Sequence, residues 1–84
     1  MMVTIYGKPN CKFCIKAKNL VDGRMLKYEY KDVSLATNMD ELKNLYPAAK
    51  TVPQIFISGK HIGGYKEFAS YLEDTGYNGT GSTL

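Results

Sequence analysis

The residues best suited to chemistry in this chain are two cysteines three positions apart, in the segment Cys11-Lys12-Phe13-Cys14. The 84 residues contain these two cysteines and one histidine, too few for a four-ligand structural zinc site within one chain. A small secreted domain held by disulfides would use more cysteines. A purely structural crosslink at this spacing would close a very small loop and add little stability. The pair therefore indicates thiol–disulfide exchange.

We expect the two cysteines to differ in reactivity. Cys11 falls at the start of a predicted helix, where unpaired N–H groups and the helix dipole stabilise a thiolate and lower the pKa of the thiol. Lys8 and Lys12 add positive charge on either side of it. Cys14 lies one turn further along, on the apolar face of the same helix. Cys11 is therefore the predicted attacking thiolate, and Cys14 the predicted resolving thiol.

Composition and charge limit the classes of protein that fit. The chain is 44% hydrophobic and 23% charged, with a net charge of +3, which is typical of a globular domain. Residues 1–21 contain four lysines and no acid, so small anions and thiolates are favoured there. A nucleic-acid surface would need a denser basic stripe. With no apolar run near the ~18 residues of a membrane helix and no signal-peptide pattern, we expect a cytoplasmic monomer without membrane or nucleic-acid partners.

The elements that must position the cysteines alternate between strand and helix patterns. The first helix is expected to have Asn10 as its N-cap and to end at Asp22-Gly23. A second helix is expected to take its cap and first turn from residues 37–41, to bury Met39, Leu42 and Leu45, and to stop at Pro47. Strands are predicted near residues 3–6, 28–30, 54–57 and 61–62, and helices near 11–21, 37–46 and 65–74.

This order, β-α-β-α-β-β-α, predicts an α/β fold with a four-stranded mixed sheet flanked by three helices. The first two strands should be parallel and the last two antiparallel. A C-x-x-C between the first strand and first helix is typical of the thioredoxin-like fold. One domain is predicted over residues 1–75, followed by a flexible tail over residues 76–84 that is rich in Gly, Ser and Thr.

Two further segments allow more than one interpretation. Pro53, in Thr51-Val52-Pro53, could be an ordinary trans proline at the start of a strand, or a cis proline that presents the Val52 backbone to a peptide-like substrate. Gly63-Gly64 could be an ordinary loop, or a close backbone approach beside a helix N-terminus that binds a carboxylate. His61 is expected at the hairpin surface without a role. Three tyrosines are expected to be packing residues rather than site residues: Tyr6, Tyr28 and Tyr30.

Taken together, these segments resemble the glutaredoxin family, especially the small dithiol glutaredoxins of bacteria and their phages. The resemblance covers residues 2 to about 74. It is carried by Gly7-Lys8, Cys11-Lys12-Phe13-Cys14, Thr51-Val52-Pro53-Gln54-Ile55-Phe56-Ile57 and His61-Ile62-Gly63-Gly64-Tyr65 followed by Glu67-Phe68. It implies a thioredoxin-like fold that binds glutathione as a co-substrate, with no metal.

The resemblance also implies roles for individual residues. The nucleophile falls on Cys11, the resolving cysteine on Cys14 and the cis proline on Pro53. Val52 would hold the cysteine part of glutathione through its main chain, and Lys8 would attract the glycine carboxylate. The implied glutathione contacts are Lys8, Phe13, Thr51, Val52, Pro53, Gly63, Gly64, Tyr65, Lys66 and Glu67, with Glu67 opposite the γ-glutamyl ammonium group.

The implied function is a glutathione-dependent oxidoreductase that reduces protein disulfides and glutathione mixed disulfides, with ribonucleotide reductase as a common client of the family. The chain departs from the usual family pattern in two places: Lys12-Phe13 replaces Pro-Tyr, and Glu67 replaces Asp. Three alternatives stay open. The first is a redoxin recharged by thioredoxin reductase, and the second is an iron–sulfur cluster carrier in which two chains share a cluster through Cys11 and glutathione. The third is a non-catalytic redox-sensing or binding module.

Overall fold

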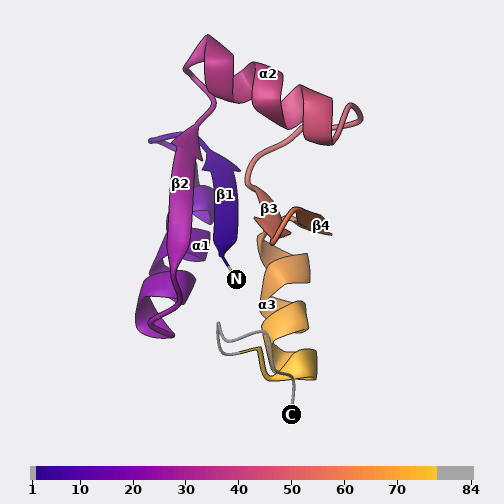
Figure 1. The fold of residues 1–84 in the computed structure, drawn as a ribbon. Helices are drawn as coiled ribbons and strands as arrows, with labels where there is room; N and C mark the ends of the chain where they lie inside the picture. Colours follow the sequence, from indigo (N-terminus) through magenta and orange to yellow (C-terminus); the bar gives the residue numbers. More distant parts are fainter. Residues whose placement is uncertain (1, 78–84) are drawn as a thin grey trace.

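The computed structural model describes residues 2–77, and its elements follow the predicted order (Figure 1). The strands are β1 (Val3–Gly7), β2 (Tyr28–Asp32), β3 (Gln54–Ile57) and β4 (Lys60–Gly63). The helices are α1 (Lys12–Gly23), α2 (Ala36–Leu45) and α3 (Tyr65–Thr75). Within residues 2–77, no helix is long and apolar enough to cross a membrane.

The four strands form one mixed sheet in the order β2-β1-β3-β4. β1 pairs in parallel with β2, as predicted for a β-α-β unit, and β3 and β4 form the predicted antiparallel hairpin. β1 also pairs antiparallel with β3, with Tyr6 opposite Gln54. This pairing places the C-terminal end of β1, which leads into the cysteines, beside the start of β3, which follows Pro53.

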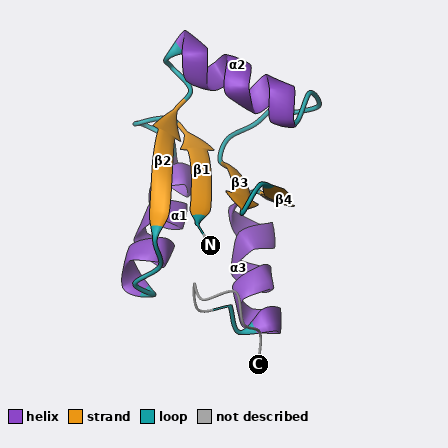
Figure 2. Ribbon diagram, viewed as in Figure 1, coloured by secondary structure: helices purple, strands orange, loops and turns teal. Residues whose placement is uncertain are grey.

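Helices pack against both faces of the sheet through two separate cores. Figure 2 shows α1 behind β1 and β2, and α2 across the C-terminal ends of these strands. Because side chains alternate along a strand, Val3 and Ile5 of β1 point to one face and Tyr6 to the other. The first face packs against α1 and α3 through Ala17, Val21, Phe68 and Leu72. Tyr6 belongs to a second, smaller core under α2, with these other buried members: Val33, Leu42, Ala49 and Phe56. The sheet is therefore the middle layer of three.

The N-terminal end of α1 differs from expectation, whereas its C-terminal end falls at the predicted residue. The N-cap is Cys11 rather than Asn10, because the Cys11 sulfur itself accepts the Cys14 N–H at 3.1 Å. α1 ends at Gly23, as predicted, and the chain turns after it. The left-handed conformation falls on Met25, with φ of 56° and a fully solvent-facing side chain. This turn lets the Leu26 N–H donate to the Val21 carbonyl and returns Leu26 to the core.

Helix α2 begins earlier and buries less than predicted. It starts at Ala36, and its N-cap Leu35 makes no side-chain capping bond. Asn38, expected near the cap, instead donates from Nδ2 to the Asp32 carbonyl. Leu42 is buried, but Leu45 is 50% exposed because it lies beyond the edge of the small core. The predicted apolar stripe is therefore correct for Leu42 and wrong for Leu45.

The packed part of the chain extends past α3. Gly76 is the left-handed C-cap of α3, and Tyr77 is 4% exposed within the core formed by α1, α3 and the sheet. These two residues were assigned to the tail by the sequence pattern and belong instead to the packed structure. Residues 78–84, the remainder of the expected tail, lie outside the described residues.

Candidate active site

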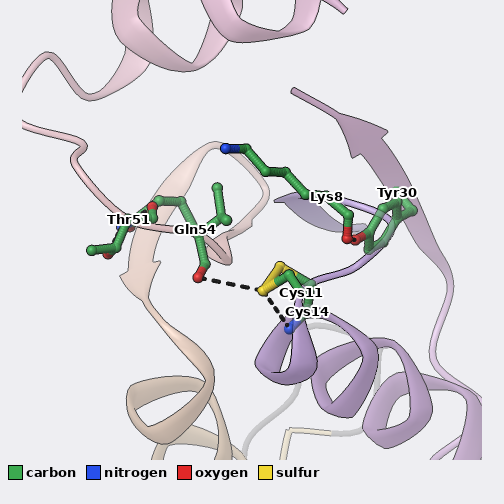
Figure 3. The surroundings of a disulfide bond; sticks show 7 residues. Lys8, Cys11, Cys14, Tyr30, Thr51 and Gln54 are labelled. Carbon is green, nitrogen blue, oxygen red and sulfur yellow. Dashed lines mark hydrogen bonds between the residues drawn. A yellow bond between two sulfur atoms is a disulfide. The ribbon is translucent and has the colours of Figure 1, made fainter. Parts of the chain in front are cut away.

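The two cysteines lie at the N-terminus of α1 and form a disulfide, with their Cα atoms 5.1 Å apart (Figure 3). Cys14 is fully buried on the inner face of α1, whereas Cys11 is half-buried at the helix end. The Cys11 sulfur accepts the Cys14 N–H, one of the N–H groups that the first turn leaves unpaired. The cysteine at the surface can therefore meet a substrate, while the buried one can reach only its neighbour.

A loop from the other half of the chain lies against the Cys11 sulfur. The Val52–Pro53 peptide bond is cis, the interpretation that the sequence had left open. The Val52 carbonyl oxygen lies 3.7 Å from the Cys11 sulfur. In the described part of the chain, the Val52 N–H has no hydrogen-bond partner. The main chain of Val52 is therefore placed beside the Cys11 sulfur with its N–H donor free.

Gln54 and His61 hold this loop, a role that the sequence did not reveal. Gln54 is 7% exposed, and its Nε2 donates to the Thr51 carbonyl at 3.0 Å. Its Oε1 lies 2.8 Å from His61 Nε2, while the His61 ring stacks on Tyr46 with centroids 4.1 Å apart. The available signal was a glutamine at the head of an otherwise apolar strand, since a buried amide must find partners. His61, expected to be a surface residue, is half-buried in this network.

Gly7 and Tyr30 support the cysteines from the sheet side. A Cβ atom on Gly7 would lie 2.5 Å from the Tyr30 hydroxyl oxygen and 2.9 Å from the Cys14 sulfur, so this position has room only for glycine. The Tyr30 hydroxyl donates to the Lys8 carbonyl at 2.9 Å (Figure 3). Burial, with a smaller contribution from Asp32, raises the pKa of Tyr30, so the phenol remains a donor at neutral pH. Tyr30 is therefore more than a packing residue.

A groove of about 190 Å³ opens beside the Cys11 sulfur. It is lined by residues from three places in the chain: Phe13, Thr51, Val52, Pro53, Gly64, Tyr65, Lys66 and Glu67. Its aromatic rings, Phe13 and Tyr65, have centroids 6.0 Å apart. All eight lining residues were singled out in the sequence. Two other predicted site residues do not line this groove. Lys8 lines a neighbouring groove, and Gly63 is buried.

The Gly63-Gly64 turn shapes one end of this groove. Gly63 has a φ of 132°, which other residues rarely adopt, and a Cβ atom there would lie 2.8 Å from the Glu67 Cβ. Gly64 is the N-cap of α3, and its N–H donates to Glu67 Oε1 at 2.8 Å. Glu67 thus caps α3 from within and still exposes its carboxylate to the groove.

This arrangement defines the class of protein. A four-stranded mixed sheet between helices, a C-x-x-C at the first helix N-terminus and a cis proline loop opposite it form a thioredoxin-like redox domain. The glutaredoxin family model matches residues 3–62. Glutaredoxin of Haemophilus influenzae is 36% identical over 81 residues, covering 88% of this chain and 93% of the relative. Glutaredoxin 1 of Escherichia coli is 32% identical, covering 88% and 95%.

Solved structures agree with these matches. Reduced Escherichia coli glutaredoxin superposes with a TM-score of 0.73 at 32% identity, covering 88% of this chain and 95% of that one. A buckwheat glutaredoxin–glutathione complex gives a TM-score of 0.73 at 27% identity, covering 86% and 68%. This chain therefore belongs to the glutaredoxin family. It is a thiol–disulfide oxidoreductase, and its Cys11–Cys14 pair fits that activity.

Proposed function

We propose that this glutaredoxin uses glutathione to reduce protein disulfides and protein–glutathione mixed disulfides, with Cys11 as nucleophile and Cys14 as resolving cysteine. The observation that carries the proposal is the groove beside Cys11. In this groove the Val52 main chain can form hydrogen bonds with the backbone of a small peptide that bears a thiol. The buckwheat relative was solved as a complex with glutathione, which supports the same ligand here. A cycle of this kind needs the reduced glutathione pool of the cytoplasm.

The groove offers a suitable contact for each part of glutathione. Val52 would pair with the cysteine part through its main chain, in the groove that Phe13 and Tyr65 also line. The γ-glutamyl carboxylate would bind near Gly64 at the N-terminus of α3, where the helix dipole is positive. Glu67 would then face the γ-glutamyl ammonium group. The other proposed contacts are Lys8 at the glycine carboxylate, with Thr51, Pro53, Gly63 and Lys66 around the tripeptide.

Reduction of a client proceeds by two exchanges. The Cys11 thiolate attacks one sulfur of the client disulfide, forming a mixed disulfide and releasing one client cysteine as a thiolate. The Cys14 thiolate then attacks the Cys11 sulfur, which releases the second client thiolate and forms the Cys11–Cys14 disulfide. Two protons from water complete the client thiols, and two electrons have passed to the client.

Glutathione restores the dithiol by two further exchanges. One glutathione thiolate attacks the Cys11 sulfur, forming a Cys11–glutathione mixed disulfide and releasing Cys14. A second glutathione attacks the sulfur of the bound glutathione, which yields glutathione disulfide and free Cys11. A protein–glutathione mixed disulfide needs Cys11 alone, because the attack transfers glutathione directly to Cys11. Ribonucleotide reductase is a client that the family resemblance suggests.

A coupled turnover assay with glutathione, glutathione reductase and NADPH tests this proposal. The wild type should reduce both an intramolecular protein disulfide and a protein–glutathione mixed disulfide. Cys14→Ser should keep the second activity and lose the first, and Cys11→Ser should lose both by more than 100-fold, an order-of-magnitude estimate for removing a nucleophile. Equal turnover by Cys11→Ser and the wild type would contradict the assignment.

A parallel assay separates the alternative redoxin function. Thioredoxin reductase and NADPH replace the glutathione system, with the same protein disulfide as substrate. The proposal expects rapid turnover with glutathione and slow turnover with thioredoxin reductase. The reverse result would identify a redoxin recharged by thioredoxin reductase and would contradict the proposed use of glutathione.

A further inference from the structure

A second groove, of about 360 Å³, opens on the α2 side of the active site. It shares Thr51 and Val52 with the groove described above, so the two grooves meet at the loop that faces the Cys11 sulfur. α2 crosses the end of the sheet where β1 and β2 finish (Figure 1). Residues of α2 form one wall of the groove. A polypeptide whose sulfur reached Cys11 could therefore continue into this groove.

The rim of the second groove is positively charged. Three lysines line it, Lys8 from the loop after β1, Lys43 from the last turn of α2 and Lys50 from the loop before β3, and no acidic residue does. Lys43 Nζ donates to the Ala49 carbonyl, which keeps the ammonium group at the rim with two further protons to donate. Among residues 2–77, the ion pairs are formed by Arg24 and Lys31 and by none of these three lysines.

The floor of the groove is apolar. It is formed by Met39 and Leu42 of α2, together with Ala49 and Val52. A small anion would satisfy the lysines and leave this floor open to water. A stretch of polypeptide could bring carboxylates to the rim and cover the floor with its backbone and apolar side chains at the same time.

From this combination we propose that the second groove binds an acidic segment of the client polypeptide, next to the disulfide being reduced. The proposal rests on the proposed function, because it needs the client sulfur at Cys11. It adds no chemical step: the Cys11 thiolate attacks, Cys14 resolves, and the client gains two electrons and two protons as above. The lysines raise the rate of productive encounter with acidic clients, an effect that salt weakens.

Two synthetic peptides test the proposal. Both contain the same intramolecular disulfide, but one carries three glutamates beside it and the other carries glutamines at the same positions. Stopped-flow mixing with the reduced protein gives the second-order rate constant for each peptide. The test variant is Lys43→Gln with Lys50→Gln, which leaves Lys8 intact. The control variant is Lys27→Gln with Lys60→Gln, which removes equal charge at the opposite end of the sheet, next to Tyr28 and Ile57.

The wild type and the control variant should reduce the acidic peptide faster than the neutral one, and the difference should shrink at high salt. The test variant should lose roughly three- to tenfold on the acidic peptide, as expected for two exposed ion pairs, and stay unchanged on the neutral peptide. Equal rates of the test and control variants on the acidic peptide would overturn the proposal. So would an equal loss on both peptides. If the wild type reduced neither peptide, the proposed function itself would be wrong.

Discussion

At the scale of single residues, the two cysteines differ in their exposure to solvent. Cys14 is covered completely by the core, and Cys11 is the N-cap of α1, next to the Val52 carbonyl. The sequence predicted this division, because the i, i+3 spacing places one cysteine at the helix end and the other on the apolar face. It could not predict that sulfur would replace Asn10 as the cap, since the exposed Asn10 is the better capping side chain by type.

Gly7 gives a direct test of how closely the site is packed. Gly7→Ala should lower the free energy of unfolding by about 1–3 kcal/mol, because the new Cβ would overlap the Tyr30 hydroxyl and the Cys14 sulfur. Gly23→Ala is the matched control, since nothing lies within 4 Å of its Cβ position at the end of α1. That variant should be neutral or slightly more stable. Urea unfolding of both variants measures the difference, and equal stabilities would show that the Gly7 contact is not tight.

The loop network shows which residue roles a single sequence conceals. Gln54 and His61 are seven positions apart and on different strands, and they meet because β3 and β4 form a hairpin. Neither residue fits a motif for catalysis, and a lone histidine is uninformative without its neighbours. The position of Pro53 was identifiable from sequence, but the groups that hold its loop were not.

At the scale of elements, the types and order were predictable, and so was the end of α1 at Gly23, but the starts of α1 and α2 were not. Alternating and helical periodicities identified four strands and three helices, because those patterns reflect which face is buried. The helix starts depend on single contacts instead. The N-cap of α1 is Cys11 because its sulfur accepts the Cys14 N–H, and α2 starts at Ala36 although Leu35 offers no capping side chain.

Helix α2, which forms one wall of the second groove, is attached to the sheet by a charged network. Lys31 of β2 donates to Glu41 at 2.6 Å, and the hydroxyl of Tyr6 on β1 donates to the same oxygen. The hydrogen bond from Lys31, followed by that from Tyr6, holds the pKa of Glu41 below its ordinary value. Burial and the bond to Glu41 raise the pKa of Tyr6, so the phenol stays protonated.

This network predicts a pH-dependent stability. A carboxyl whose pKa is lower in the folded state stabilises the fold above its unfolded pKa, and the contribution disappears as pH falls through the folded pKa. Glu41→Gln should therefore be less stable than the wild type near neutral pH, and the difference should shrink once the pH falls below 4.5, the ordinary carboxyl value. Urea unfolding across pH measures this. Asp40→Asn, on the same helix, is the control, and a pH-independent deficit in Glu41→Gln would contradict the assignment.

At the scale of the whole molecule, the site is assembled by the strand order. Placing β1 next to β3 brings residues 8–14 against residues 51–54, and the β3–β4 hairpin returns residues 63–67 to the same groove. Sequence patterns predicted the parallel and antiparallel pairs between neighbouring elements. They did not predict that β1 and β3 are partners, because that pairing depends on packing in both cores between residues that are far apart in the sequence. The family resemblance supplied the groove residues that local patterns could not.

The assignment of Cys11 as the nucleophile is tested most directly by locating the cysteine to which glutathione becomes attached. The Cys14→Ser protein, reduced and then incubated with oxidised glutathione, should gain one glutathione, and peptide mapping by mass spectrometry should locate it on Cys11. The Cys11→Ser protein should gain none in the same time, because the Cys14 sulfur is buried. Attachment to Cys14, or no attachment to Cys11 in the first variant, would contradict the assignment of Cys11 as the nucleophile.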